Sequence, residues 1–225
     1  MNRAREHSEP GSTHSGRRSK RGWAMRALAG GALAASLVLT VSVPASAASP
    51  SVRTDPAGDT LIKDAPGYMD MVSIQLAERG GMFEFQMSVA APVPAAPPLP
   101  PPATKGISWN WGLDTNPTTF PAGYPLPPGL PGTVEFVITI TWDGSAFRAF
   151  LVDRRPLLTG GQAVITPLDY TISGTLLQVD VNADAVGNPS SFGWGATTTY
   201  SSGPSGSGGL QFVDEFSPFV APWPS

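Results

Sequence analysis

Hydrophobic and polar residues alternate through most of the chain after residue 50, and no stretch there keeps an apolar stripe at helical spacing. Alternation with period two is typical of strands that bury one face and expose the other. The pattern predicts about ten strands. They cover residues 72–77, 83–89, 107–113, 134–142, 147–152, 163–166, 170–173, 176–181, 192–198 and 210–213.

Short turn sequences separate neighbouring strands. Gly80-Gly81, Asp143-Gly144 and Ser173-Gly174 each stand between two alternating segments. Glycine adopts the positive φ that tight hairpin turns require. Frequent turns between half-buried strands predict an all-β fold, a single antiparallel β-sandwich.

Two proline-rich segments interrupt the alternation. Residues 92–102 include seven prolines and residues 121–131 include five. Proline fixes φ and removes the backbone N–H, so neither segment can form a central strand. We expect stiff loops there, which serve either as a lip beside a ligand site or as surface insertions.

Residues 1–47 have the features of an export signal. Seven Lys/Arg within residues 3–26 precede the uncharged apolar run Ala27–Val43, and Ala45-Ser46-Ala47 follows as a cleavage site. An uncleaved anchor is the alternative, because this apolar run is at the lower limit for crossing a bilayer. We expect cleavage, which leaves a secreted domain of residues 48–225 without a membrane span.

The composition excludes several kinds of catalytic site and binding partner. Both histidines, His7 and His14, lie in the leader, and the chain has no cysteine. A Ser-His-Asp triad or a cysteine nucleophile is therefore excluded after residue 47. The seven Lys/Arg and 15 Asp/Glu of residues 48–225 give a net charge of −8, which disfavours nucleic acid and anionic membranes. We expect a non-catalytic protein, with a glycoside hydrolase that uses paired carboxylates as the remote alternative.

Aspartates near the start of the domain form a candidate metal site. Asp55 and Asp59 flank a glycine-containing turn, and Asp70 precedes the first predicted strand. Calcium takes six to eight oxygen ligands and accepts mixed carboxylate and carbonyl donors. The alternative is that these aspartates cap turns, a role that their side chains also suit.

Aromatic residues form a candidate ligand site, because a sugar ring can stack on an exposed indole. Trp109 and Trp111 share the face of their hydrophobic neighbours and are expected in the core. Trp194 stands between two glycines that leave its ring uncovered, and Trp142 ends a strand beside a turn. Tyr124, in the second proline-rich segment, is a weaker candidate.

Several short motifs in one order resemble the extracellular DOMON-like domains, which are related in fold to family 9 carbohydrate-binding modules. The motifs are Asp55-Pro56-Ala57-Gly58-Asp59, Gly67-Tyr68-Met69-Asp70, Leu113-Asp114-Thr115-Asn116, Thr141-Trp142-Asp143-Gly144 and the closing pair Asp214 and Pro218. The resemblance implies a jelly-roll-like sandwich, often with structural calcium, and places metal ligands among Asp55, Asp59 and Asp70. Some members bind sugars, and others bind haem or have no known ligand.

These observations together predict a secreted, non-catalytic module that binds carbohydrate or another cell-surface polymer. The alternative is a structural or adhesion sandwich that calcium stabilises and that has no small-molecule ligand. No haem is expected, because the domain lacks histidine and cysteine. The oligomeric state stays open.

Overall fold

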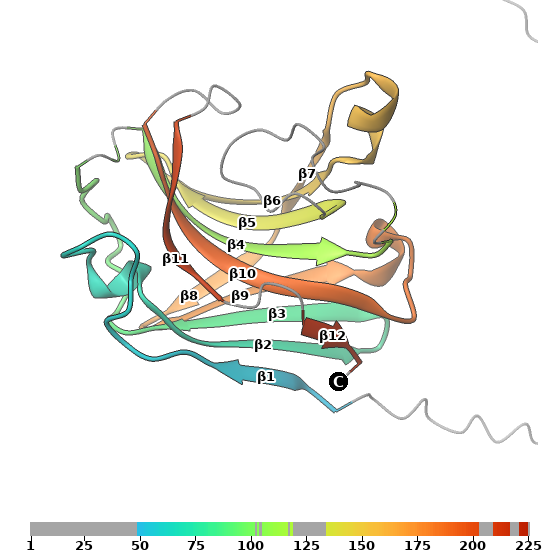
Figure 1. Cartoon of the computed structure of the whole chain (residues 1–225), viewed down its shortest axis with the longest axis horizontal. Coiled ribbons are helices and arrows are strands. Elements are labelled where there is room, and N and C mark those ends of the chain that lie inside the picture. The colour runs from blue at the N-terminus through green and yellow to red at the C-terminus, as the bar shows by residue number, and fades with distance from the viewer. Residues whose placement is uncertain are drawn as a thin grey trace, which may run out of the picture. The chain divides into compact units, whose positions relative to one another are not determined.

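Two antiparallel sheets pack face to face in the computed structural model, which describes residues 49–101, 103, 105–116, 118, 134–202, 209–216 and 221–224 (Figure 1). The all-β sandwich predicted from the alternation is confirmed. The five-stranded sheet has the order β1 (Ser51–Thr54), β2 (Met71–Arg79), β3 (Met82–Val89), β9 (Leu176–Asn182), β8 (Tyr170–Ser173).

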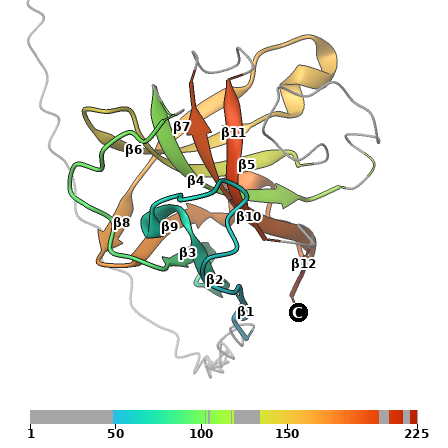
Figure 2. The ribbon, with the colours of Figure 1, turned by 60° about the vertical axis from the view of Figure 1, so that its left-hand side comes forward.

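The second, seven-stranded sheet contains the remaining strands. Its order is β11 (Leu210–Glu215), β10 (Phe192–Ser201), β4 (Gly106–Asp114), β5 (Phe136–Trp142), β6 (Phe147–Asp153), β7 (Val164–Leu168). The short β12 (Ala221–Trp223) pairs with the start of β10, whereas β11 pairs with its end, as the rotated view in Figure 2 also shows. Helical structure in the described residues consists of three 3-10 turns, η1 (Gly67–Met69), η2 (Arg155–Thr159) and η3 (Ala183–Val186).

The turns follow their sequence signals. Arg79 pairs with Met82, so Gly80 and Gly81 form a two-residue turn with φ of 60° and 81°. A β-branched or bulky residue would be strained at either position. The Asp143-Gly144 hairpin is present but wider than the tight turn expected, because the last strand pair is Trp142 with Phe147.

Hydrophobic side chains from both sheets meet in one core. Trp109 and Trp111 of β4 are fully buried there, as their position in the alternation predicted. The Trp111 indole N–H donates to the Gln86 carbonyl of β3 at 3.3 Å, and the Trp109 indole donates to the Tyr68 carbonyl at 2.8 Å. Both indoles thus bury a large apolar ring and satisfy its polar atom, as a buried tryptophan requires.

The first proline-rich segment forms no strand in its described residues. The Val93 N–H donates to the Gly174 carbonyl at 2.9 Å, and the Tyr68 hydroxyl donates to the Pro98 carbonyl at 3.0 Å. The segment therefore lies against the sandwich as a loop. The second proline-rich segment, 121–131, lies outside the described residues.

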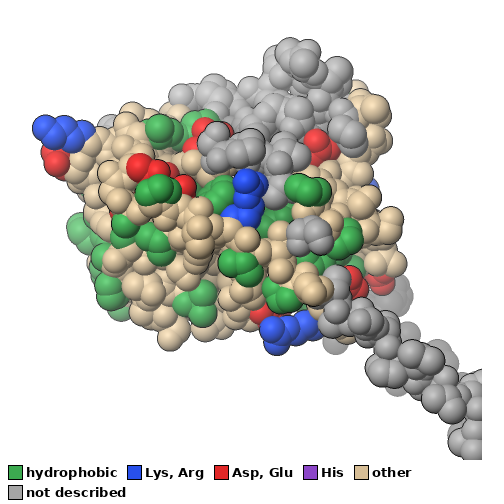
Figure 3. Space-filling model, turned by 60° about the horizontal axis from the view of Figure 1, so that its bottom comes forward, with side chains coloured by type: hydrophobic (Ala, Val, Ile, Leu, Met, Phe, Trp, Pro, Cys, Tyr) green, Lys and Arg blue, Asp and Glu red, His purple; other side chains and the backbone are tan. Residues whose placement is uncertain are grey.

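Among the described residues in the view of Figure 3, hydrophobic side chains lie in small groups separated by polar surface. Within the described ranges, no helix has the length and apolar character that a membrane crossing needs.

Candidate functional site

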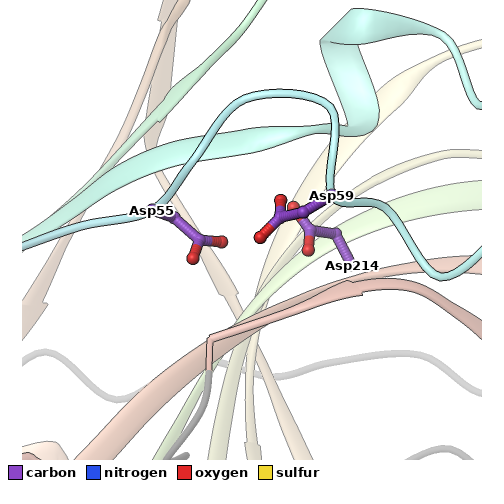
Figure 4. A group of neighbouring side chains, drawn as sticks. All are labelled: Asp55, Asp59 and Asp214. Carbon is purple, nitrogen blue, oxygen red and sulfur yellow. The ribbon is translucent and has the colours of Figure 1, made fainter.

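Three carboxylates from distant parts of the chain converge at one end of the sandwich. Asp55 and Asp59 lie in the connection between β1 and η1, and Asp214 lies on β11. One oxygen of each lies within 4.8 Å of the others, and Figure 4 shows the three groups pointing into the same space. We call Asp55, Asp59, Asp214 and the neighbouring Asp70 the acidic cluster.

Local backbone geometry places the first two carboxylates. The Asp55 N–H donates to the Val72 carbonyl of β2 at 2.9 Å and continues the pairing of β1. The chain then turns at Gly58, whose φ of 87° favours glycine, and Asp59 follows. The turn brings Asp59 back toward Asp55.

A β-bulge places Asp214. Thr198 of β10 pairs with Asp214 whereas Thr199 pairs with Phe212, so Val213 is an extra residue in β11. A bulge re-aims the side chains next to it. As a result, the adjacent Val213 and Asp214 are both buried, with Asp214 only 2% exposed.

Asp214 also joins the two sheets. Its Oδ2 accepts from the Met71 N–H of β2 at 2.7 Å, and its Oδ1 accepts from the Glu215 N–H at 2.9 Å. Close by, the Leu61 N–H donates to the Val213 carbonyl at 2.8 Å. The acidic cluster thus lies where the first segments of the domain meet β11.

Asp70 is the fourth member of the acidic cluster. It is 6% exposed, and its Oδ2 accepts from the Gly58 N–H at 2.8 Å. Its Oδ1 is shielded from solvent and has no hydrogen-bond partner, and the same is true of Asp55 Oδ2. A buried carboxylate oxygen without a donor is costly, so these two oxygens need an explanation.

Electrostatics indicate that the carboxylates of the acidic cluster repel one another, although backbone N–H groups stabilise the charge of Asp214. Burial and the nearby charges of Asp214, Asp59 and Asp70 raise the pKa of Asp55 from 3.8 to about 6. Burial also raises the pKa of Asp214, with smaller contributions from Asp59 and Asp70. Like charges in a shielded space disfavour ionisation of each group. A cation placed among these oxygens would relieve that repulsion.

The oxygens suit a hard cation. Calcium binds six to eight oxygens at 2.3–2.6 Å and accepts irregular carboxylate geometry. Asp55, Asp59 and Asp214 supply carboxylate oxygens, and Asp70 supplies a further one that no donor occupies. Asp70 belongs to the predicted site but not to the closest group of three, where Asp214 takes its place.

The sequence did not identify Asp214 as a ligand. It lies at the other end of the chain, and its position depends on the bulge in β11, which has no sequence signal of its own. The one hint was the motif order, in which the acidic residue near the C-terminus closes the series.

The predicted aromatic site is not supported. Trp194 is 0% exposed and Trp142 is 7% exposed, so neither indole presents a face to a ligand. The expectation that flanking glycines leave Trp194 uncovered is wrong, because its side chain belongs to the buried hydrophobic core. Tyr124 lies outside the described residues. In the described ranges, the exposed large hydrophobic residues include one aromatic, Tyr170.

Comparison with protein families, curated proteins and solved structures finds no match to this chain. The resemblance to DOMON-like domains therefore stays a prediction from the motifs. Within the described residues, the geometry of the acidic cluster is the stronger guide to function.

Proposed function

We propose that this protein is a secreted, non-catalytic β-sandwich that a calcium ion stabilises at the acidic cluster, and that it acts as a structural or adhesion module. The observation that supports this proposal most is the origin of the ligands. Asp55, Asp59 and Asp70 adjoin strands of the five-stranded sheet, whereas Asp214 belongs to the seven-stranded sheet. One cation at this position would connect both layers.

Turn capping alone does not account for these residues. It accounts for Asp70 Oδ2, which accepts a hydrogen bond from the Gly58 N–H, and for both oxygens of Asp214, which accept from backbone N–H groups. It leaves Asp55 Oδ2 and Asp70 Oδ1 shielded and without donors. A bound cation gives both oxygens a role and offsets the mutual repulsion of the carboxylates.

Calcium fits the site better than magnesium. Magnesium demands near-ideal octahedral geometry and gives up its water reluctantly, whereas calcium accepts carboxylates at irregular angles. Three carboxylates from a turn and a bulged strand are such an irregular set. The export signal predicted for residues 1–47 also places the domain where weak calcium sites, with Kd of about 10⁻⁴ to 10⁻³ M, are filled.

Binding at this site should raise thermal stability. A ligand at about 100 times its Kd adds about 2.7 kcal/mol, and each kcal/mol raises Tm by about 2–4 °C in a domain of this size. We therefore expect the metal-free protein to gain roughly 5–10 °C in Tm when calcium is added to saturation. Differential scanning fluorimetry with chelator and with calcium measures this gain.

A matched pair of variants separates a specific site from a general salt effect. Asp59→Asn removes an exposed ligand, and Asp64→Asn removes the same charge from the same connection outside the acidic cluster. We expect Asp59→Asn to lose most of the calcium-dependent gain, and to be at least as stable as the parent in chelator because one repulsive charge is gone. Asp64→Asn should keep the gain. A Tm that does not respond to calcium in the parent protein contradicts the proposal.

A further inference from the structure

The exposed hydrophobic side chains of the described residues gather at one border of the sandwich. Six large hydrophobic side chains are exposed in these residues, and four of them lie within residues 158–170: Leu158, Val164, Ile165 and Tyr170. They belong to η2, β7 and β8, which follow one another along the chain. Figure 1 shows η2 and the start of β7 at a corner of the molecule. Exposed apolar residues that gather in one place mark an interaction surface, whereas single scattered ones do not.

This border also carries almost no charge. Residues 156–179 contain a single charged side chain, Asp169, in a domain whose net charge is −8. Two copies of an acidic protein repel one another, and the repulsion is smallest where charged groups are absent. A second copy of the chain would therefore approach most easily through this border.

β7 ends the strand order of the seven-stranded sheet, so within the described residues one side of its backbone has no neighbouring strand. The hydrogen bonds of β6 decide which residues face that open side. Arg154, directly after β6, donates its N–H to the carbonyl of Glu135, directly before β5. The backbone groups of successive residues in a strand point to opposite neighbours. Val152 and Phe150 of β6 therefore also point their backbone groups toward β5.

The partners of these two residues in β7 point their backbone groups to the open side. Val152 pairs with Ile165, and Phe150 pairs with Pro167. Because β6 directs the N–H and C=O of both residues to β5, it makes no hydrogen bond to Ile165 or Pro167. Proline has no N–H, so its presence at a position without a hydrogen bond to β6 agrees with this register. The open side presents the N–H and C=O of Ile165 and the C=O of Pro167.

We propose that β7 pairs in antiparallel orientation with the β7 of a second copy of this chain, about a two-fold axis at Ile165. Each Ile165 N–H then donates to the Ile165 carbonyl of the other copy, and each Ala163 N–H donates to the Pro167 carbonyl of the other copy. The two Ile165 side chains lie next to one another on the same face of the joined sheet. Val164, Ile165 and Thr166 are β-branched residues, which strand pairing favours. An open, uncharged edge strand is a template for such pairing.

The length of the paired segment determines how strong this contact is. Gly160 ends η2 with a φ of 76°, and Pro167 offers no N–H, so the pairing spans only residues 163–167. Stable interfaces bury about 1,200–2,000 Å² in total, and one strand pair of this length falls below that range. We therefore expect a reversible dimer whose population rises with protein concentration.

Sedimentation equilibrium of the full secreted domain over a concentration series measures this dimer. Ile165→Lys places two ammonium groups next to one another at the two-fold axis, and we expect it to raise the dissociation constant roughly tenfold or more. Val52→Lys is the matched control, because Val52 is also β-branched, lies on the edge strand β1 and is 57% exposed against 62% for Ile165. It should change the dissociation constant by less than about twofold. A parent protein that stays monomeric over the whole series, or a dimer that both variants weaken equally, overturns the proposal.

Cross-linking tests the position of the two-fold axis and gives a second readout if the lysine variant fails to fold. The chain has no cysteine, so Ile165→Cys introduces a single thiol. Residues opposite one another in a hydrogen-bonded antiparallel pair have Cα atoms about 5.5 Å apart, which a disulfide can span. With a mild thiol oxidant we expect Ile165→Cys to form a covalent dimer several times faster than Val52→Cys. Equal rates for the two variants contradict the assignment.

The dimer and the calcium site can be tested apart, because residues 163–167 include no member of the acidic cluster. Both experiments are done with calcium and with chelator. A parent protein that binds calcium but stays monomeric contradicts only the dimer. A parent protein that dimerises but does not bind calcium contradicts only the function proposed for the acidic cluster.

Discussion

At the scale of single residues, the free-energy cost of burying charge falls on a few carboxylates. Asp70 and Asp214 are almost fully buried, and each gives at least one oxygen to a backbone N–H. Asp55 has no such compensation at Oδ2. These acids therefore stabilise local backbone geometry and at the same time repel one another.

The raised pKa of Asp55 predicts how the metal-free protein responds to pH. Its pKa is about 6 in the folded state against 3.8 ordinarily, so the folded protein binds the proton more tightly than the unfolded chain. This contribution to stability is fully present below about pH 3.8 and is lost as the pH rises through about 6. We expect the metal-free Tm to be higher at pH 5 than at pH 7.5.

Asp55→Asn separates the titration of Asp55 from the titration of the other acidic groups. The variant should lose much of the difference in Tm between pH 5 and pH 7.5. Saturating calcium should also remove it from the parent protein, because the cation favours the ionised carboxylate. A metal-free parent that is equally stable at both pH values would falsify the assigned repulsion.

The sequence predicts the residues of the site that are close together in the chain, but not the residue that is far from them. Asp55, Asp59 and Asp70 could be placed together because they are close in the chain and separated by a turn. Asp214 could not, since a bulge in a strand near the other end of the chain brings it there. For Trp194, the flanking glycines suggest exposure, but the alternation of β10 points its ring into the core.

At the scale of elements, all ten strands that the alternation predicts are present in the structure. The alternation missed β1 and β12, which are four and three residues long. β1 has one hydrophobic residue, Val52, which is exposed, and β12 contains Pro222, so neither shows an apolar/polar alternation and tertiary pairing decides whether they form. β1 leads into the acidic cluster, and β12 pairs with the start of β10.

Hydrogen exchange tests whether the acidic cluster holds these elements together. Calcium should slow exchange of the Leu61 and Met71 N–H groups, because Leu61 donates to the Val213 carbonyl and Met71 donates to Asp214 Oδ2. The Val179 N–H of β9, a strand distant from the acidic cluster in the sheet order, serves as the reference. Calcium that protects Val179 as much as Leu61 and Met71 would argue against a local connection.

At the scale of the whole molecule, two sheets share one apolar core and a few polar links. The Trp111 indole links β4 to β3, and Asp214 links β11 to β2. The burial of Trp111 could be predicted from the sequence, because it follows the buried face of its strand. The link through Asp214 could not, because it depends on which ends of the two sheets meet.

Binding of one calcium ion between the sheets at the acidic cluster can be measured by isothermal titration of calcium into the metal-free protein. We expect one site per chain, lost in the double variant Asp55→Asn/Asp59→Asn. The double variant Asp64→Asn/Asp169→Asn, which has the same net charge and changes two exposed aspartates outside the acidic cluster, should keep the site. No saturable calcium binding in the parent protein, or equal binding in both double variants, would rule out a calcium site at the acidic cluster.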